Sequence, residues 1–381
     1  KLFLLEAYAL IYRAYYAFIK NPRINSKGFN TSAILGFVNT LEEVLKKENP
    51  SHIGVAFDPS GPTFRHEAFE QYKAQREETP EAIRLSVPII KDIIHAYRIP
   101  ILEVAGYEAD DVIGTLATEA GRQGITTYMM TPDKDYGQLV TDNVFMYRPK
   151  HTGGFEVMGI EEVKAKFDIQ SPAQVIDMLG LMGDASDNIP GCPGVGEKTA
   201  QKLIAEFGSI ENLLEHTDQL KGALKTKVET NKELITFSKF LATIKIDVPI
   251  QLEMDKLVRE QADEDSLRQI FEELEFRTLI DRVLKKENSA GGVTMATGSK
   301  TATAKSAPSP LPLFPEEGGA IQGDLFANFT GNEAGEAKKS NLETLETLNC
   351  DYQLIDTEKK RAEIIQKLLT SKILSLDTET T

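Results

Sequence analysis

Apolar residues follow two different spacings along the first 185 residues of this chain. Short apolar runs are typical of buried strands, and they occur at 2–5, 53–57, 101–104, 126–130 and 144–147. Between them, apolar residues recur at the 3.6-residue period and predict helices, most clearly over 31–47, 86–97 and 110–122. Alternating strands and helices predict an α/β fold with a mainly parallel sheet and flanking helices.

The pattern changes after residue 171, which we predict to end an α/β domain. Four stretches within 172–285 carry an apolar stripe at the helical period: "PAQVIDMLGLM", "EKTAQKLIAEF", "SIENLLEH" and "SLRQIFEELEF". Residues 286–348 are rich in Ser, Thr, Ala, Gly and Pro and predict a disordered linker. Residues 349–381 follow a strand–helix–strand pattern. We therefore expect a helical subdomain, a linker and the truncated start of another α/β domain, in a chain that is a fragment.

Composition narrows the class of protein. The 381 residues are 41% hydrophobic and 27% charged, which is ordinary for a soluble globular protein. No stretch of 18 apolar residues occurs, and Glu6 and Arg13 interrupt the opening apolar run, so we expect neither a membrane span nor a signal peptide. Cys192 and Cys350 form no CxxC pair and the five histidines lack a zinc spacing, which favours a reducing cytoplasm and argues against zinc.

Acidic residues gather at the ends of the predicted strands. Because the carboxyl ends of parallel strands lie along one edge of a sheet, we expect these acids to meet there. The candidates are Glu6, Asp58, Glu108, Asp110, Asp111, Asp133, Asp135, Asp184 and Asp187. The net charge of −15 argues against nucleic acid only when taken alone, because local charge decides binding.

The segment "GYEADDVIG" illustrates the two interpretations of these acids. Helix capping explains one or two acids at a helix start, and most single acids are caps or solvated loop charges. Nine carboxylates on one edge would repel each other unless cations are bound. All-oxygen ligands favour Mg²⁺ or Mn²⁺, and two ions about 4 Å apart suit phosphodiester hydrolysis.

Two further segments carry groups suited to phosphate. In 62–84, Lys73 and Arg76 are spaced i, i+3 among aromatic residues, as in a phosphate clamp or an amphipathic surface helix. In 189–204, the turn Gly194-Val195-Gly196 leads into a helix that carries Lys198 and Lys202. N–H groups at such a helix start bind phosphate, although a simple helix connector has the same pattern.

The motifs together resemble a known family. "YRAYYA", "VAFDPSGPTFRH", "YKAQR", "GYEADDVIGTLA", "TPDKDYGQLV" and "LMGDASDNIPGCPGVGEKTA" occur in this order. Over about 1–285 they are similar to the 5′ nuclease (5′–3′ exonuclease) domains of bacterial DNA polymerase I, which are related to flap endonucleases. The tail "ILSLDTETT" resembles the first motif of a 3′–5′ exonuclease domain.

The resemblance implies a PIN-like fold, a helix-hairpin-helix subdomain of the H2TH type and two-metal cleavage of 5′ flaps, nicks and RNA-primed DNA. It implies that the nine acids bind or organise the ions and that Lys73 and Arg76 contact the scissile phosphate. It assigns DNA binding to Arg65, Tyr72 and the hairpin 194–196 with Lys198 and Lys202, and a K⁺ ion to that hairpin. A bacterial, cytoplasmic, nucleoid-associated protein of replication and repair is expected.

One position departs from the family, which usually has Asp where this chain has Glu6. Glutamate is longer by one carbon–carbon bond, about 1.5 Å. We therefore expect weaker metal binding or slower cleavage than with aspartate at this position.

A short peptide in the linker has its own resemblance. "IQGDLFANF", with Gln322, Asp324, Leu325 and Phe326, resembles the Q-x-[SD]-L-F peptide that docks on the bacterial sliding clamp. Chance apolar residues in a linker are the alternative.

Two other functions stay open at this point. A PIN-type ribonuclease would also cluster acids, but the helical region with its glycine hairpin favours a duplex-binding enzyme. A non-catalytic DNA-binding module with an impaired site would account for Glu6, but the eight other acids argue against it.

Overall fold

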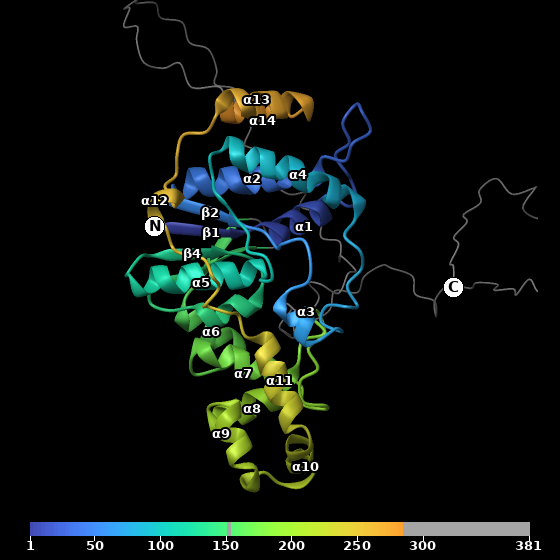
Figure 1. Ribbon diagram of the computed structural model, residues 1–381, viewed down its shortest axis with the longest axis vertical. Coiled ribbons are helices and arrows are strands. Elements are labelled where there is room, and N and C mark those ends of the chain that lie inside the picture. Colours follow the sequence, from blue (N-terminus) through green and yellow to red (C-terminus); the bar gives the residue numbers. More distant parts are fainter. Residues whose placement is uncertain (151–153, 285–381) are drawn as a thin grey trace, which may run out of the picture. The chain divides into compact units, whose positions relative to one another are not determined.

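The computed structural model describes residues 1–150 and 154–284. Within these residues, six strands form one sheet in the order β3-β2-β1-β4-β5-β6 (Figure 1). The strands are β1 (Leu2–Glu6), β2 (His52–Ala56), β3 (Ile101–Leu102), β4 (Thr127–Met130), β5 (Val144–Pro149) and β6 (Phe155–Met158). The first five are parallel, which confirms the predicted sheet, and β6 pairs antiparallel with β5. The sequence did not predict β6 because only Met158 among its four residues is buried.

Helices connect and cover the strands. The longer ones are α1 (Ala7–Ala17), α2 (Ser32–Lys47), α4 (Glu81–Ala96), α5 (Ala109–Arg122), α6 (Ile160–Phe167), α7 (Val175–Met182), α8 (Glu197–Phe207), α10 (Gly222–Thr230), α11 (Lys232–Ala242) and α13 (Glu264–Glu273). The short ones are α3 (Phe64–Ala68), η1 (Lys134–Leu139), η2 (Pro172–Gln174), α9 (Ile210–Glu215), η3 (Thr217–Gln219), α12 (Met254–Leu257), α14 (Arg277–Leu279) and η4 (Ile280–Leu284). The three helices expected over 31–47, 86–97 and 110–122 are confirmed as α2, α4 and α5.

The central strand β1 separates two apolar cores. Successive side chains of a strand point to opposite faces. Leu2 and Leu4 join the core that contains α5, whereas Phe3 and Leu5 join the core that contains α1, α2 and α4. All four side chains are fully buried, each stabilising the fold by about 1.5–3 kcal/mol. Helices therefore cover the sheet on both faces, with α2 and α4 on one side and α5 on the other (Figure 1).

The packing crosses the domain boundary that we predicted at residue 171. The helices α7, α8, α9 and α11 share one continuous apolar core with the α5 face of the sheet. The predicted helix in "SLRQIFEELEF" is present as α13, but its buried Leu267 and Phe271 belong to the opposite core, against α4. The stretch 172–285 therefore contributes helices to both faces of the sheet.

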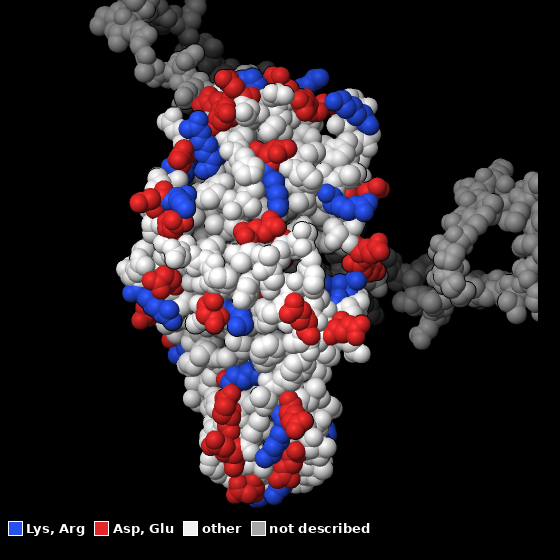
Figure 2. All heavy atoms as spheres, in the orientation of Figure 1, with Lys and Arg blue, Asp and Glu red and all other residues white. Residues whose placement is uncertain are grey.

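Acidic and basic side chains are interspersed over most of the face seen in Figure 2, and acidic groups run together at its lower end. Any attraction for a polyanion on that face is therefore local. No helix in the described ranges has the length and apolar character needed to cross a membrane.

Candidate active site

The carboxyl edge of the sheet brings several predicted acids together. Glu6 is the last residue of β1, Asp58 lies two residues beyond β2, and Asp133 lies three residues beyond β4. Both neighbours of β1 run parallel to it in register, so the three ends share one edge. Asp58 accepts a hydrogen bond from the backbone N–H of Ala109 at 2.8 Å, which joins this edge to the start of α5.

Three more acids come from the start of α5. Glu108 is the residue that precedes the helix, and the Asp111 carboxylate accepts from its backbone N–H at 3.1 Å. Asp111 therefore performs the capping role that acids commonly have at a helix start. Glu108, Asp110 and Asp111 each offer one carboxylate oxygen, and these three atoms all lie within 4.8 Å of one another. Among the described residues, this is the group whose oxygens lie close enough together to hold one metal ion.

Arg65 holds two of these acids in place. Its guanidinium donates to Glu108 and twice to Asp111, each at 2.8 Å, and to the carbonyls of Leu241 and Thr243 at 2.9 and 2.8 Å. These contacts use all five N–H groups of arginine. The side chain is 1% exposed. We predicted that Arg65 holds a DNA strand, and the structure corrects this. The Arg65 side chain is buried, and its hydrogen bonds connect α3 with α5 and with the end of α11.

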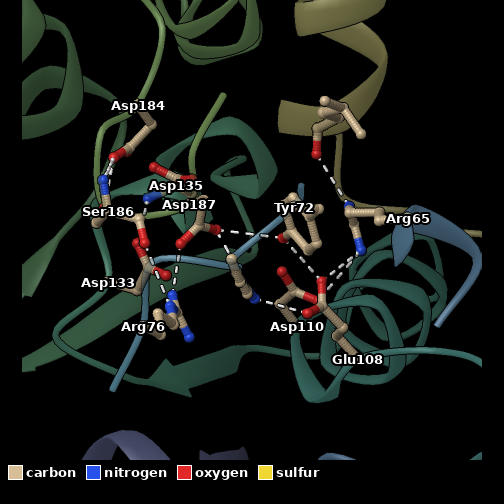
Figure 3. A network of polar contacts seen from close by, with 12 residues as sticks. Arg65, Tyr72, Arg76, Glu108, Asp110, Asp133, Asp135, Asp184, Ser186 and Asp187 are labelled. Atoms are coloured by element: carbon tan, nitrogen blue, oxygen red, sulfur yellow. Dashed lines mark hydrogen bonds and ion pairs between the residues drawn. The ribbon is translucent and has the colours of Figure 1, made fainter. Parts of the chain in front are cut away.

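Tyr72 also lies inside the protein rather than at a DNA-facing surface. It is 3% exposed, and its hydroxyl lies 3.0 Å from Glu108 and 3.2 Å from Asp187. Figure 3 shows Tyr72 between two groups of acids. One group is Glu108 and Asp110, close to Arg65, and the other is Asp133, Asp135, Asp184 and Asp187. The DNA contact predicted for Tyr72 is replaced by a contact that joins the two groups.

Lys73 and Arg76 both contact these acids, and their predicted contact with the scissile phosphate stays a prediction. The Lys73 ammonium lies 2.6 Å from Glu108 and 3.7 Å from Asp187, and Arg76 donates to Asp187. The Lys73 backbone has φ 56°, a left-handed conformation unusual outside glycine, and its N–H donates to the Asp187 carbonyl at 3.0 Å. Arg76 is the more accessible of the two, with 41% of its side chain exposed.

The acids divide into two sets by their partners. Glu108, Asp111, Asp184 and Asp187 each contact a cationic side chain closely, and Asp110 lies 4.0 Å from Arg65. In the second set, burial raises the pKa of Asp58, Asp133 and Asp135, and it also raises the pKa of Asp110. For Glu6, burial and then the charges of Asp133 and Asp58 raise the pKa to about 8. Burial makes the charged form of these carboxyls costly, and a cation bound beside them would lower that cost.

These residues fit a divalent cation. The donor set consists of carboxylate oxygens, the ligands that Mg²⁺ and Mn²⁺ prefer. The buried Oδ1 of Asp135 has no hydrogen-bond partner among the described residues, although the Asp133 side chain accepts from the Asp135 backbone N–H. A cation would supply the missing charge and the missing partner. Which of the nine acids are direct ligands stays a prediction.

Sequence reasoning missed residues that lie within the motifs it singled out. Lys134 lies 2.6 Å from Asp184, and the Thr131 hydroxyl donates to Glu6. Both are in "TPDKDYGQLV". The signal for Lys134 was its place between two acids, whereas nothing local indicated that Thr131 faces Glu6, 125 residues away.

The predicted glycine hairpin forms as a turn before α8. Gly194 has φ +75°, and Gly196 is the residue before the helix, with open space where a Cβ would lie. Val195 is buried, whereas Lys198 and Lys202 are exposed one helical turn apart. The Lys227 ammonium lies 3.2 Å from the Gly194 carbonyl oxygen. The hairpin thus presents backbone and lysines to solvent, but contributes no group to the acid cluster.

Comparison with known proteins identifies the family. Residues 1–168 match the model of the 5′–3′ exonuclease N-terminal resolvase-like domain, and 170–265 match that of the 5′–3′ exonuclease C-terminal SAM fold. The chain belongs to the 5′–3′ exonuclease family. Among solved structures, it resembles T5 5′-exonuclease with bound zinc (TM-score 0.53, 21% identity, covering 72% of this chain and 98% of that one). It also resembles the catalytic core of Rad2 with DNA substrate (TM-score 0.51, 18%, 72% and 87%). These likenesses support the fold.

The curated relatives of this chain are bacterial DNA polymerases I. The chain is 43% identical to that of Bacillus subtilis over 286 residues, 74% of this chain and 32% of the relative. It is 34% identical to that of Mycobacterium tuberculosis over 347 residues, 91% of this chain and 37% of the relative. The chain therefore spans about a third of the length of these relatives.

Proposed function

We propose that this chain hydrolyses phosphodiester bonds at the 5′ ends of DNA, as a metal-dependent 5′–3′ exonuclease and flap endonuclease of a DNA polymerase I. The observation that carries the proposal is the gathering of acids at the carboxyl edge of the sheet and the start of α5, with Lys73 and Arg76 beside them. Membership of the 5′–3′ exonuclease family supports the reaction class.

The cluster fits the charges of this reaction. Divalent cations held by the acids would activate water and stabilise the leaving oxygen. Lys73 and Arg76 would neutralise the scissile phosphate as its charge changes in the transition state. The contact of Lys73 with Glu108 and that of Arg76 with Asp187 keep these two side chains oriented before a substrate arrives.

We propose that the hairpin 194–196 with Lys198 and Lys202 binds the duplex beyond the cleaved strand. Exposed N–H groups and lysines at a helix start bind backbone phosphates without reading sequence. The Lys227 ammonium would compete with the predicted K⁺ ion for the Gly194 carbonyl oxygen, because it already contacts this oxygen. If K⁺ binds, duplex affinity will differ between KCl and NaCl at equal ionic strength, and Lys227→Met will widen the difference.

The sliding clamp is a proposed partner through Gln322, Leu325 and Phe326, which lie outside the described residues. An apolar pair of this kind suits docking in a groove on a partner protein. Purified clamp should retain the chain in a pull-down, and Leu325→Ala with Phe326→Ala should abolish this. Unchanged retention would refute the proposal. Nucleoid association would follow from binding DNA and the clamp.

A cleavage assay tests the function directly. A labelled duplex with a 5′ flap should be cut in the presence of Mg²⁺, and EDTA should stop the reaction. Binding without cleavage would indicate a DNA-binding module. Cleavage of RNA alone would indicate a PIN-type ribonuclease.

A further inference from the structure

Tyr136 carries a polar atom that the described protein does not satisfy. The residue lies in η1, directly after Asp135, and its side chain is 0% exposed. The hydroxyl oxygen has no hydrogen-bond partner among the described residues. A buried hydroxyl without a partner costs folding free energy, and a phenylalanine would fill the same space without this cost.

Tyr136 lies on elements that carry or adjoin the predicted metal ligands. The helix η1 starts at the end of β4 and packs against α5, which begins beside Glu108 and Asp110. After burial, the charges of Glu6, Asp110, Asp133 and Asp58 raise the pKa of Tyr136. Tyr136 belongs to the same apolar core as Ala109, which lies between Glu108 and Asp110, and Tyr72, whose hydroxyl contacts Glu108. The Tyr136 hydroxyl itself forms no hydrogen bond with any of these carboxylates.

We propose that Tyr136 is a positioning residue of the divalent-cation site, whose hydroxyl donates a hydrogen bond to a ligand oxygen of the bound ion. The inference rests on the proposed function, since it needs the acid cluster to bind metal. Groups that orient metal ligands from behind are typically worth 10- to 100-fold in metal affinity, so we expect an effect of about tenfold. The unpaired hydroxyl would then lower the free energy of unfolding only in the metal-free protein.

The test compares three forms of the full chain: the unchanged protein, Tyr136→Phe and Tyr97→Phe. Each is stripped of metal with EDTA and its Tm is measured as MgCl₂ is titrated in excess. Tyr97 is the matched control because it is also buried, at 5% exposed, but its hydroxyl donates to Glu42 at 2.6 Å. A ligand that binds only the folded state raises Tm with its concentration relative to Kd.

For Tyr136→Phe we expect a metal-free Tm equal to or above that of the unchanged protein, and about tenfold more Mg²⁺ for the same rise in Tm. For Tyr97→Phe we expect a lower metal-free Tm and an unchanged Mg²⁺ requirement. An unchanged Mg²⁺ requirement for Tyr136→Phe would overturn the inference. So would a lower metal-free Tm, which would mean that an ordered water already satisfies the hydroxyl. No Mg²⁺ response in the unchanged protein would overturn the proposed metal site itself.

Discussion

At the scale of single residues, Arg65 differs most from its sequence interpretation. A basic residue among aromatics in a nuclease-like motif predicts a DNA contact, whereas the structure buries it with five acceptors. Two of those acceptors are the carbonyls of Leu241 and Thr243, 176 and 178 residues away in the chain. No local pattern could reveal them.

Arg65→Met should therefore act on stability. Removing one partner of a buried ion pair leaves the other charge uncompensated and costs about 3–5 kcal/mol of unfolding free energy. Arg84, whose side chain is 70% exposed, provides the control, and Arg84→Met should change stability by less than about 0.5 kcal/mol. Urea unfolding measures both. Equal stability of the two variants would contradict the role assigned to Arg65.

Glu6 gives a second prediction at this scale. Its carboxylate accepts a hydrogen bond from Thr131 and is placed at the edge by the end of β1. Aspartate would shorten the side chain by about 1.5 Å. We expect Glu6→Asp to bind Mg²⁺ more tightly or to cleave a flap faster. Identical rates for both proteins throughout a Mg²⁺ titration would refute this expectation.

The raised pKa of Glu6 also predicts a pH dependence. Its pKa is about 8 in the folded protein against 4.5 ordinarily, so the folded state binds more protons between these values. The metal-free protein should therefore lose stability as pH rises through this range. Glu6→Gln removes the titrating group and should flatten the curve, and Mg²⁺ should do so partly. Urea unfolding free energies at several pH values check this; parallel curves for the two proteins would contradict it.

At the scale of elements, the strands and their ends could be predicted because parallel strands are apolar runs with a fixed direction. This was enough to bring Glu6, Asp58 and Asp133 to one edge. The division of the acids into partnered and unpartnered sets could not be predicted, because Lys73, Arg76 and Lys134 find their partners through the tertiary fold. The same holds for α13, whose helical period indicates a helix but not which core it joins.

Phe271→Ala tests the placement of α13. The side chain is fully buried in the core with α4, and its removal should cost about 3–5 kcal/mol of unfolding free energy. Phe240, which is 42% exposed on α11, is the matched control, and Phe240→Ala should cost far less. If the two variants unfold at the same urea concentration, α13 does not belong to the sheet core.

At the scale of the whole molecule, two rigid cores hold a cluster of carboxylates whose charge the protein only half compensates. Arg65, Lys73, Arg76 and Lys134 neutralise one set of acids. We propose that the other set binds cations and, through them, a DNA phosphate. The net charge of −15 is compatible with DNA binding because the local charge of the site, with its lysines, arginines and any bound cations, decides binding rather than the total charge.

The most direct measurement is the rate of 5′-flap cleavage by Asp110→Asn compared with Asp142→Asn, at saturating Mg²⁺. Asp110 belongs to the dense group of acids, and its amide variant keeps the oxygen that accepts from the Asp111 N–H. Asp142 is exposed in a turn. We predict a loss of about a hundredfold or more for Asp110→Asn, as for other groups that stabilise transition-state charge, and an unchanged rate for Asp142→Asn. Equal rates for both variants would contradict the account.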